Sequence, residues 1–181
     1  MSAIMTVIVD NKSDCSLSGE WGLCILIEYA GKKILLDAGS SDLFATNMKE
    51  LGFDISDVDI ATQSHAHYDH SNGWPRFFSE NQKATLFLRK STADNCYAKK
   101  FIFKKYIGIP RRMNEKFSDR IKYVSGDHKL IDGVYLIPHK TAGLENIGRR
   151  ELMFQKQGRR FVPDDFSHEQ SLAVETPKGL V

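Results

Sequence analysis

One stretch of ten residues, numbers 64–73, constrains the fold of this chain more than any other. It reads SHAHYDHSNG and gathers three imidazoles and one carboxylate within six residues: His65, His67, Asp69 and His70. A helix would spread these side chains around its circumference, and a strand would divide them between two faces. Residues 59–62, just before the stretch, have the composition of a short strand. The pattern therefore predicts a strand that ends in a tight loop, with the four polar side chains turned inward.

This chemistry points to a metal centre, because imidazole nitrogen and carboxylate oxygen are ligands that zinc, iron and manganese accept. The spacing indicates two divalent ions, about 3.5–4 Å apart as in other two-metal sites. His65 and His67 would hold one ion, and Asp69 and His70 the other. Zinc is the first candidate, with manganese or iron as alternatives. The competing interpretation is a cluster of polar surface residues without an ion.

The motif from His65 to His70 resembles the second motif of the metallo-β-lactamase superfamily. Residues 33–39, KILLDAG, resemble the first motif of that family. More narrowly, residues 14–39 and 164–179 resemble the dihydropterin–ribofuranosylaminobenzene phosphate synthase-like branch of metal-dependent hydrolases. The resemblance implies an α/β fold, in which two mixed β-sheets form a sandwich with helices on the outer faces. We expect residues 1–181 to form a single domain of this kind.

The resemblance also implies ligands beyond the four in the loop. In the family, the next strand delivers a third His, and later segments add a bridging carboxylate and a last His. The present sequence ends before these positions, so we expect an αβ/βα sandwich that is incomplete at the C-terminus. His168 remains unassigned as a ligand, because the family typically has an acidic or polar residue at its position.

The expected activity is hydrolysis by a metal-activated hydroxide of an ester, a lactone or a phosphoester. Asp69 would be the catalytic residue, since it can accept a proton from the attacking water as well as bind metal. One alternative is a truncated, inactive metal-binding domain, or a site completed by a second subunit. Another is a nuclease-type phosphodiesterase of the same superfamily. The net charge of +2 argues against the basic clamp that a nucleic-acid partner would need.

Composition fits a globular protein, with 41% hydrophobic and 27% charged residues among 181. We see no signal peptide, and no apolar run approaches membrane-spanning length, so we expect no membrane partner. The three cysteines, Cys15, Cys24 and Cys96, form no CxxC pair and indicate reduced thiols. We therefore expect a cytoplasmic protein that acts on a small-molecule substrate.

Hydrophobic periodicity outlines the elements. Strands are expected at residues 4–9, 22–29, 33–37, 60–63, 83–88, 121–124, 129–131, 134–137 and 171–175, the later ones in a second sheet. Helices are expected at 42–51, with a buried stripe that includes Leu51, and at 72–79. Residues 139–160 suggest a long loop or hairpin.

Three further features have two interpretations each. Asp37 would either accept hydrogen bonds that orient the metal loop or cap the following helix. Trp21 would either plug the core, which we favour, or face a substrate. Residues 97–112 mix aromatic and basic side chains, which indicates a solvated amphipathic helix or a lid that binds an anionic substrate. The expected exposed sheet edge favours a homo-oligomer or marginal stability.

Overall fold

The computed structural model describes residues 1–13 and 16–181, so Cys15 lies outside the described residues. The strands are β1 (Ile4–Val9), β2 (Cys24–Tyr29), β3 (Lys32–Leu36), β4 (Ile60–Thr62), β5 (Thr85–Arg89), β6 (Cys96–Lys100), β7 (Phe103–Tyr106), β8 (Ile121–Val124), β9 (His128–Ile131), β10 (Val134–Pro138), β11 (Met153–Gln157), β12 (Arg160–Pro163), β13 (Gln170–Thr176) and β14 (Gly179–Leu180). The α-helices are α1 (Leu43–Glu50), α2 (Trp74–Glu80), α3 (Met113–Lys116) and α4 (Leu144–Arg150). Short 3-10 turns occupy Ile55–Asp57, Tyr68–His70 and Ser118–Arg120.

The first sheet has the strand order β1-β2-β3-β4-β5-β8. β2 and β3 form the predicted antiparallel hairpin, whose two turn residues, Ala30 and Gly31, both have positive φ. This is the turn geometry that matches the twist of paired strands. From β3 onward the neighbouring strands β4, β5 and β8 run parallel. Their carboxyl ends therefore lie at one edge of the sheet, and the segments that follow β3 and β4 meet there.

The two faces of this sheet bury different partners, because successive strand residues point to opposite sides. On one face the strands pack against α1 and α2 in a core that includes Leu26, Leu35, Phe44, Trp74 and Phe77. On the other face they pack against the second sheet through Ile27, Ile34, Val134 and Val174. All nine side chains are at most 2% exposed. The layers are thus helices, first sheet and second sheet.

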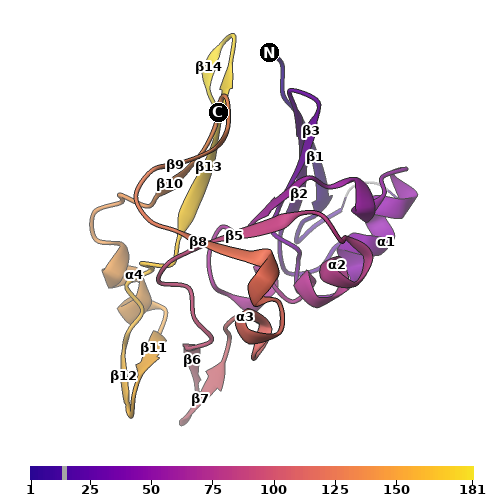
Figure 1. Cartoon of the computed structure of the whole chain (residues 1–181). Helices are drawn as coiled ribbons and strands as arrows, with labels where there is room; N and C mark the ends of the chain where they lie inside the picture. Colours follow the sequence, from indigo (N-terminus) through magenta and orange to yellow (C-terminus); the bar gives the residue numbers. More distant parts are fainter. Residues whose placement is uncertain (14–15) are drawn as a thin grey trace.

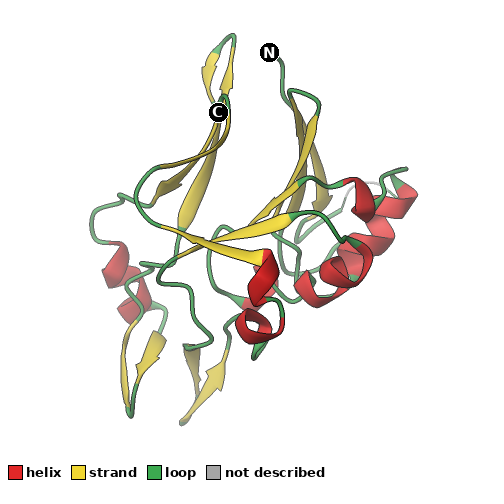
Figure 2. Ribbon diagram, in the orientation of Figure 1, coloured by secondary structure: helices red, strands yellow, loops and turns green. Residues whose placement is uncertain are grey.

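The second sheet has the order β14-β13-β10-β9, and a third has the order β12-β11-β6-β7. Figure 1 shows the first and second sheets diverging toward the end of the molecule where both chain termini lie. Figure 2 shows that α1 and α2 lie on the outer side of the first sheet, away from the second. Among the described residues, no helix combines the length and apolarity needed to cross a bilayer.

Several sequence expectations need correction. β8 joins the first sheet by pairing with β5, although it was expected in the second. Part of the stretch 97–112 lies in the β6–β7 hairpin, and the expected amphipathic helix is absent there, because β6 pairs with β11 more than fifty positions away. Residues 139–160, expected as a long loop or hairpin, contain α4 and then β11, which forms a hairpin with β12 (Arg160–Pro163). In α1 the buried stripe uses Asn47 in place of Leu51, which is 39% exposed.

Candidate metal centre

The metal loop, defined here as residues 63–73, begins at the end of β4, and its backbone is hydrogen-bonded to the segment before β2 and to the segment after β3. The amides of Leu23 and Ala38 donate to the carbonyls of Asp69 and His70 at 3.3 and 3.0 Å. At the end of the loop the backbones come so close that a Cβ on residue 73 would lie 2.1 Å from the carbonyl oxygen of Ala38. Only glycine fits at Gly73, so the loop is held in one conformation against the sheet edge.

Asp37 connects the end of β3 to the metal loop. Its side chain is fully buried, and it accepts hydrogen bonds from the Ser64 amide, the Ser64 hydroxyl and Nδ1 of His70, each at 2.7 Å. The predicted contact between Asp37 and the loop is therefore present. Helix α1 takes a different partner, since the Ser41 hydroxyl accepts from the Leu43 amide at 3.1 Å.

These hydrogen bonds determine which imidazole nitrogens remain free for an ion. His70 donates Nδ1–H to Asp37, which leaves the Nε2 lone pair unused. The single Ser64 hydroxyl proton is directed to Asp37, so Ser64 accepts from Nδ1–H of His65, at 3.0 Å. His65 is thereby also left with a free Nε2. Metal-binding histidines usually donate their other ring N–H in this way.

One group of ligand atoms comes from His65, Asp69 and His70, and its members all lie within 4.8 Å of one another. Two imidazoles and one carboxylate are a donor set that zinc, iron or manganese accepts, with further positions left for water or substrate. Burial, followed by the neighbouring imidazoles of His70 and His67, lowers the pKa of His65 well below its usual range. His65 is therefore neutral near pH 7, which is the form that binds metal.

His70 is electrostatically different from His65. Burial acts to lower the pKa of His70, but the hydrogen bond and charge of Asp37 outweigh it, and the net shift is upward. Asp69 adds to the same upward effect. The carboxylates around His70 thus make this imidazole the more basic member of the group. The same carboxylates would also attract a divalent cation to the site.

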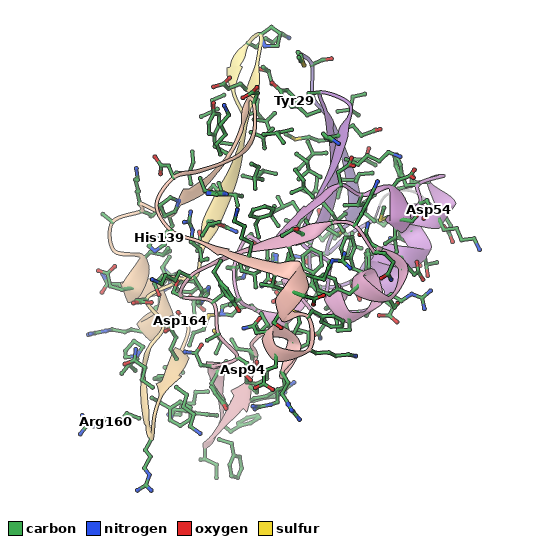
Figure 3. The ribbon with its side chains drawn as sticks, viewed as in Figure 1. Tyr29, Asp54, Asp94, His139, Arg160 and Asp164 are labelled. Atoms are coloured by element: carbon green, nitrogen blue, oxygen red, sulfur yellow. The ribbon has the colours of Figure 1, made fainter. Side chains whose placement is uncertain are left out.

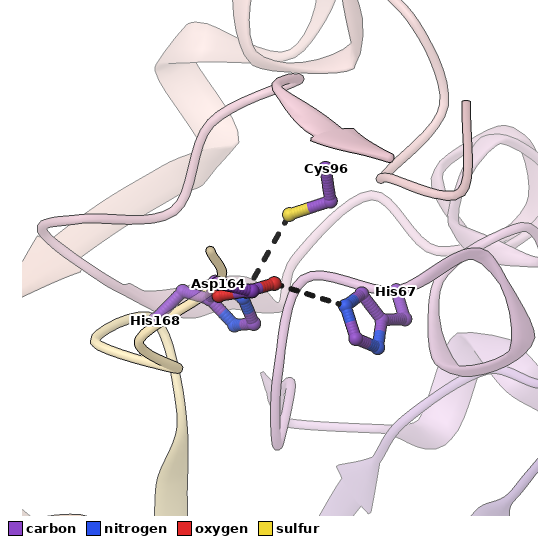
Figure 4. Close-up of side chains that lie close together, drawn as sticks. All are labelled: His67, Cys96, Asp164 and His168. Atoms are coloured by element: carbon purple, nitrogen blue, oxygen red, sulfur yellow. Dashed lines mark hydrogen bonds and ion pairs between the residues drawn. The ribbon is translucent and has the colours of Figure 1, made fainter. Parts of the chain in front are cut away.

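A second, fully buried group is formed by His67, Cys96, Asp164 and His168, whose ligand atoms also lie within 4.8 Å of one another. Nε2 of His67 and Nε2 of His168 lie 3.4 and 3.2 Å from Oδ2 of Asp164. The thiol of Cys96 lies 3.7 Å from Nε2 of His168. Figure 4 shows the four side chains converging from the metal loop, β6 and the segment before β13. Burial, followed by the carboxylates of Asp164 and Asp165, raises the pKa of the Cys96 thiol.

The structure therefore brings all four loop residues named by the sequence into one region, but it groups them differently from the expected pairs. His65 lies with Asp69 and His70, whereas His67 faces Asp164. The rings of His65 and His67 remain neighbours, with centroids 4.7 Å apart. Asp164, Cys96 and the contacts of His168 were missed, because no motif spacing connects them to the loop. In Figure 3 Asp164 lies on the side of the molecule away from Asp54, near the segment that leads into β13.

A small cavity of about 150 Å³ opens beside Asp69 and His70. The remainder of its lining comes from the segment before β2: Asp10, Asn11, Trp21, Gly22 and Leu23. Trp21 is 66% exposed, so the prediction that it plugs the core is wrong. Trp21 instead lines the cavity next to the metal loop.

Comparison with known proteins assigns the family. The family model of the metallo-beta-lactamase superfamily matches residues 22–143, which include β2, β3, the metal loop and β10. The chain belongs to the metallo-beta-lactamase superfamily. The predicted family and α/β fold class are thereby confirmed.

Individual relatives are more distant. The chain is 26% identical over 180 residues to the 7,8-dihydropterin-6-methyl-4-(beta-D-ribofuranosyl)-aminobenzene-5'-phosphate synthase of Methanocaldococcus jannaschii, covering 88% of this chain and 58% of the synthase. It is 38% identical over 73 residues to the endoribonuclease ysh1 of Aspergillus fumigatus, covering 38% of this chain and 8% of that protein. A ribonuclease of Thermus thermophilus is 32% identical over 73 residues, with 39% of this chain and 17% of the ribonuclease covered.

Among solved structures, Tm1679, described as a metal-dependent hydrolase of the beta-lactamase superfamily, superimposes with a TM-score of 0.79 and 26% identity. The superposition covers 97% of this chain and 62% of Tm1679. A quorum-quenching N-acyl homoserine lactone lactonase shares the fold at a TM-score of 0.52 and 17% identity, covering 87% of this chain and 57% of that one. The chain thus spans less than two thirds of each of these proteins.

Proposed function

We propose that the chain is a metal-dependent hydrolase that acts on an ester, a lactone or a phosphoester at the metal loop. The observation that carries the proposal is the group of His65, Asp69 and His70, in which both imidazoles have Nδ1 engaged and Nε2 free. A bound divalent ion there would polarise the substrate and lower the pKa of a coordinated water. Zinc is the first candidate and manganese and iron are alternatives, because all three accept this donor set.

The side chains of the metal loop would have different roles in metal binding and proton transfer. His65 and His70 would hold an ion, and their orientation is maintained by Ser64 and Asp37. Asp69, whose carboxylate lies 3.8 Å from Nε2 of His70, would bind the same ion or accept the proton released by the attacking water. His67 would bind a second ion beside the first, a division that differs from the expected pairing of His65 with His67 on one ion.

The cavity beside the loop supports a small substrate. Trp21 offers an exposed apolar ring at its wall, and Asp69 and His70 lie at its inner side. An aromatic ring next to polar groups can hold the organic part of a substrate while its reacting bond faces the ligands.

Metal content and hydrolysis test the proposal together. The chain would be freed of metal with a chelator, reloaded with zinc or manganese, and analysed for bound metal and for cleavage of a generic phosphodiester and a simple lactone. We expect bound metal and metal-dependent cleavage, both lost in His65→Ala. His128→Ala is the matched control, since His128 lies on β9 outside the site. A wild-type chain that binds no metal would overturn the proposal, and metal without cleavage would favour the inactive metal-binding domain.

A nuclease activity is the second candidate, favoured by the similarity to two ribonucleases over 73 residues. Four exposed lysines on the β6–β7 hairpin would contact phosphates: Lys99, Lys100, Lys104 and Lys105. Cleavage of a labelled single-stranded RNA would support this function. The double variant Lys99→Glu and Lys100→Glu should then reduce RNA cleavage at least tenfold and leave the small phosphodiester unaffected. The expectation that nucleic acid is not a partner stays a prediction until this is measured.

A further inference from the structure

The carboxylate of Asp164 is fully buried, and its partners come from three parts of the chain. Oδ1 accepts from Nε2 of Gln155 at 2.8 Å and from the amide of Phe166 at 2.9 Å. Oδ2 faces Nε2 of His67 and Nε2 of His168 at 3.4 and 3.2 Å. A buried carboxylate is costly unless its lone pairs are used. Here both oxygens have two partners each, so the group is satisfied by the protein alone.

The proton on His168 can be placed from its contacts. The backbone amide of Ala66, between His65 and His67 in the metal loop, donates to Nδ1 of His168 at 3.1 Å. An Nδ1 atom that accepts a hydrogen bond carries no proton, so the neutral ring has its proton on Nε2. That proton points to Oδ2 of Asp164. His168 therefore connects the backbone of the metal loop to the Asp164 carboxylate.

The same four buried residues have the composition of a zinc site, since they offer two imidazoles, a thiol and a carboxylate. The contact with Ala66 argues against an ion bound to His168. Binding through Nε2 would require that atom to lose its proton while Nδ1 already uses its lone pair for the amide. The ring would then have to be an imidazolate, a form that is far less accessible than neutral imidazole. The group is better described as a hydrogen-bonded network.

His67 gains a defined orientation from this network. With Oδ2 of Asp164 as acceptor, the proton of His67 lies on Nε2, and Nδ1 keeps its lone pair. No hydrogen bond to Nδ1 of His67 is present among the described residues, and the ring lies next to that of His65. Asp37 has the opposite effect on His70, where it takes the Nδ1 proton and leaves Nε2 free. Each carboxylate thus selects one nitrogen of one loop histidine.

We propose that Asp164 and His168 are positioning residues for the metal loop. Asp164 holds His67 with Nδ1 as the ligand atom, and His168 holds the loop backbone at Ala66. This inference rests on the proposed metal centre for its functional meaning, but the tautomers it assigns exist without metal. It makes the segment that leads into β13 part of the metal centre, although no ligand is contributed from it.

The first test needs no metal and no variant. Long-range proton–nitrogen correlation spectra of the metal-free chain, labelled with nitrogen-15, report the tautomer of each histidine. We expect the proton on Nε2 in His67 and His168 and on Nδ1 in His65 and His70. A proton on Nδ1 of either His67 or His168 would overturn the inference, whether or not the chain is later found to bind metal.

The second test measures zinc affinity by titration of the metal-free chain with zinc alone. Asp164→Asn should weaken binding about ten- to a hundredfold, the usual effect of removing a carboxylate behind a metal-binding histidine. Asp165→Asn is the matched control, since the Asp165 side chain is exposed and does not contact His67. Equal affinities in the two variants would contradict the inference.

The third test distinguishes a hydrogen-bonded network from a zinc ion bound by the four buried residues themselves. Cys96→Ser keeps the approximate shape of the side chain and removes the sulfur atom that could bind zinc. We expect the number of bound zinc ions and their affinity to stay unchanged. The loss of one zinc ion would show that Cys96 is a ligand and would overturn the network. If the wild-type chain binds no zinc, the proposed function fails, while the tautomer spectra still decide this inference.

Discussion

At the scale of single residues, the buried carboxylate of Asp37 connects the end of β3 to the metal loop. Asp37 has a left-handed backbone conformation, with φ of 62°, which is uncommon for a residue other than glycine but tolerated by aspartate. This conformation ends β3 and turns the side chain toward the loop that follows β4. The same carboxylate then satisfies three donors from the metal loop. One residue thereby couples the end of a strand to the orientation of His70.

Replacement of the Asp37 carboxylate should lower both the free energy of unfolding and the affinity for zinc. Asp37→Ala leaves the buried donors of Ser64 and His70 without an acceptor, which costs about 1–3 kcal/mol for each unsatisfied group. We expect a clear loss of free energy of unfolding in urea and about tenfold or greater weakening of zinc binding. Asp57→Ala is the control, because its ion pair with Lys33 is largely exposed and should change stability by less than about 1 kcal/mol. Unaltered zinc affinity in Asp37→Ala would contradict the role of Asp37.

The two described cysteines should be unreactive in the native chain. Cys24 and Cys96 are fully buried, and burial is the main cause that raises the pKa of each thiol. The nucleophilic thiolate is therefore scarce at neutral pH. Iodoacetamide at pH 7.5, followed by peptide mass spectrometry, should leave both unmodified in native protein and modify both in urea. Rapid native labelling of Cys96 would be inconsistent with its buried position.

At the scale of elements, α1 is attached to the sheet by a polar side chain as well as by apolar packing. Asn47 is 1% exposed, and its amide donates to the carbonyls of Ile8 at 2.8 Å and Ser18 at 2.9 Å. It therefore joins the helix to the end of β1 and to the segment that leads toward Trp21 and the cavity. Helical periodicity could not identify this role, because it counts apolar positions only.

Removal of this amide should loosen α1. Asn47→Ala leaves two carbonyls of the chain without that donor and opens space in the core, so we expect a loss of about 1–3 kcal/mol in the free energy of unfolding. Thr46→Ala, next to it on the helix and lining a surface groove, is the control and should have little effect. Urea denaturation followed by circular dichroism measures both. Equal midpoints for the two variants would show that the Asn47 contacts contribute nothing.

The β6–β7 hairpin illustrates how distant residues determine an element. Its aromatic and basic residues are compatible with a helix, but Tyr97 packs against Phe161 of β12, and Lys104 lies over the rings of Phe154 and Phe161. Pairing of β6 with β11 satisfies the backbone of β6 and also brings these side chains into contact, whereas an isolated helix would satisfy the backbone without those contacts. A long-range sheet therefore overrides local propensity.

At the scale of the whole molecule, the metal loop lies where the two main sheets meet. Gln170, at the start of β13, donates its backbone amide to the carbonyl of Ser64 at 2.7 Å and its side-chain amide to that of Gln63 at 2.8 Å. The second sheet thus holds the loop from one side and the first sheet from the other. Loss of contact between the sheets would disturb the site even if each sheet stayed intact.

The tip of the β6–β7 hairpin carries a patch that favours self-association. Phe101, Ile102 and Phe103 are 86%, 84% and 72% exposed, and contiguous exposed apolar residues commonly mark contacts between molecules. The expected homo-oligomer stays a prediction. We expect light scattering after size-exclusion chromatography to show concentration-dependent association, reduced in the double variant Phe101→Ser and Ile102→Ser. A wild-type chain that is monomeric at all concentrations would refute it.

The sequence by itself determined the features that depend on neighbouring residues. The motif from His65 to His70, the strand before it, the β2–β3 hairpin and the ends of α1 follow from local spacing, turn residues and alternation. Only the tertiary structure decided which histidine faces which acid, that Asp164 and His168 contact the loop, and that Trp21 is exposed beside it. These contacts join residues up to about a hundred positions apart. They arise from the packing of the two sheets against each other, which no local sequence pattern specifies.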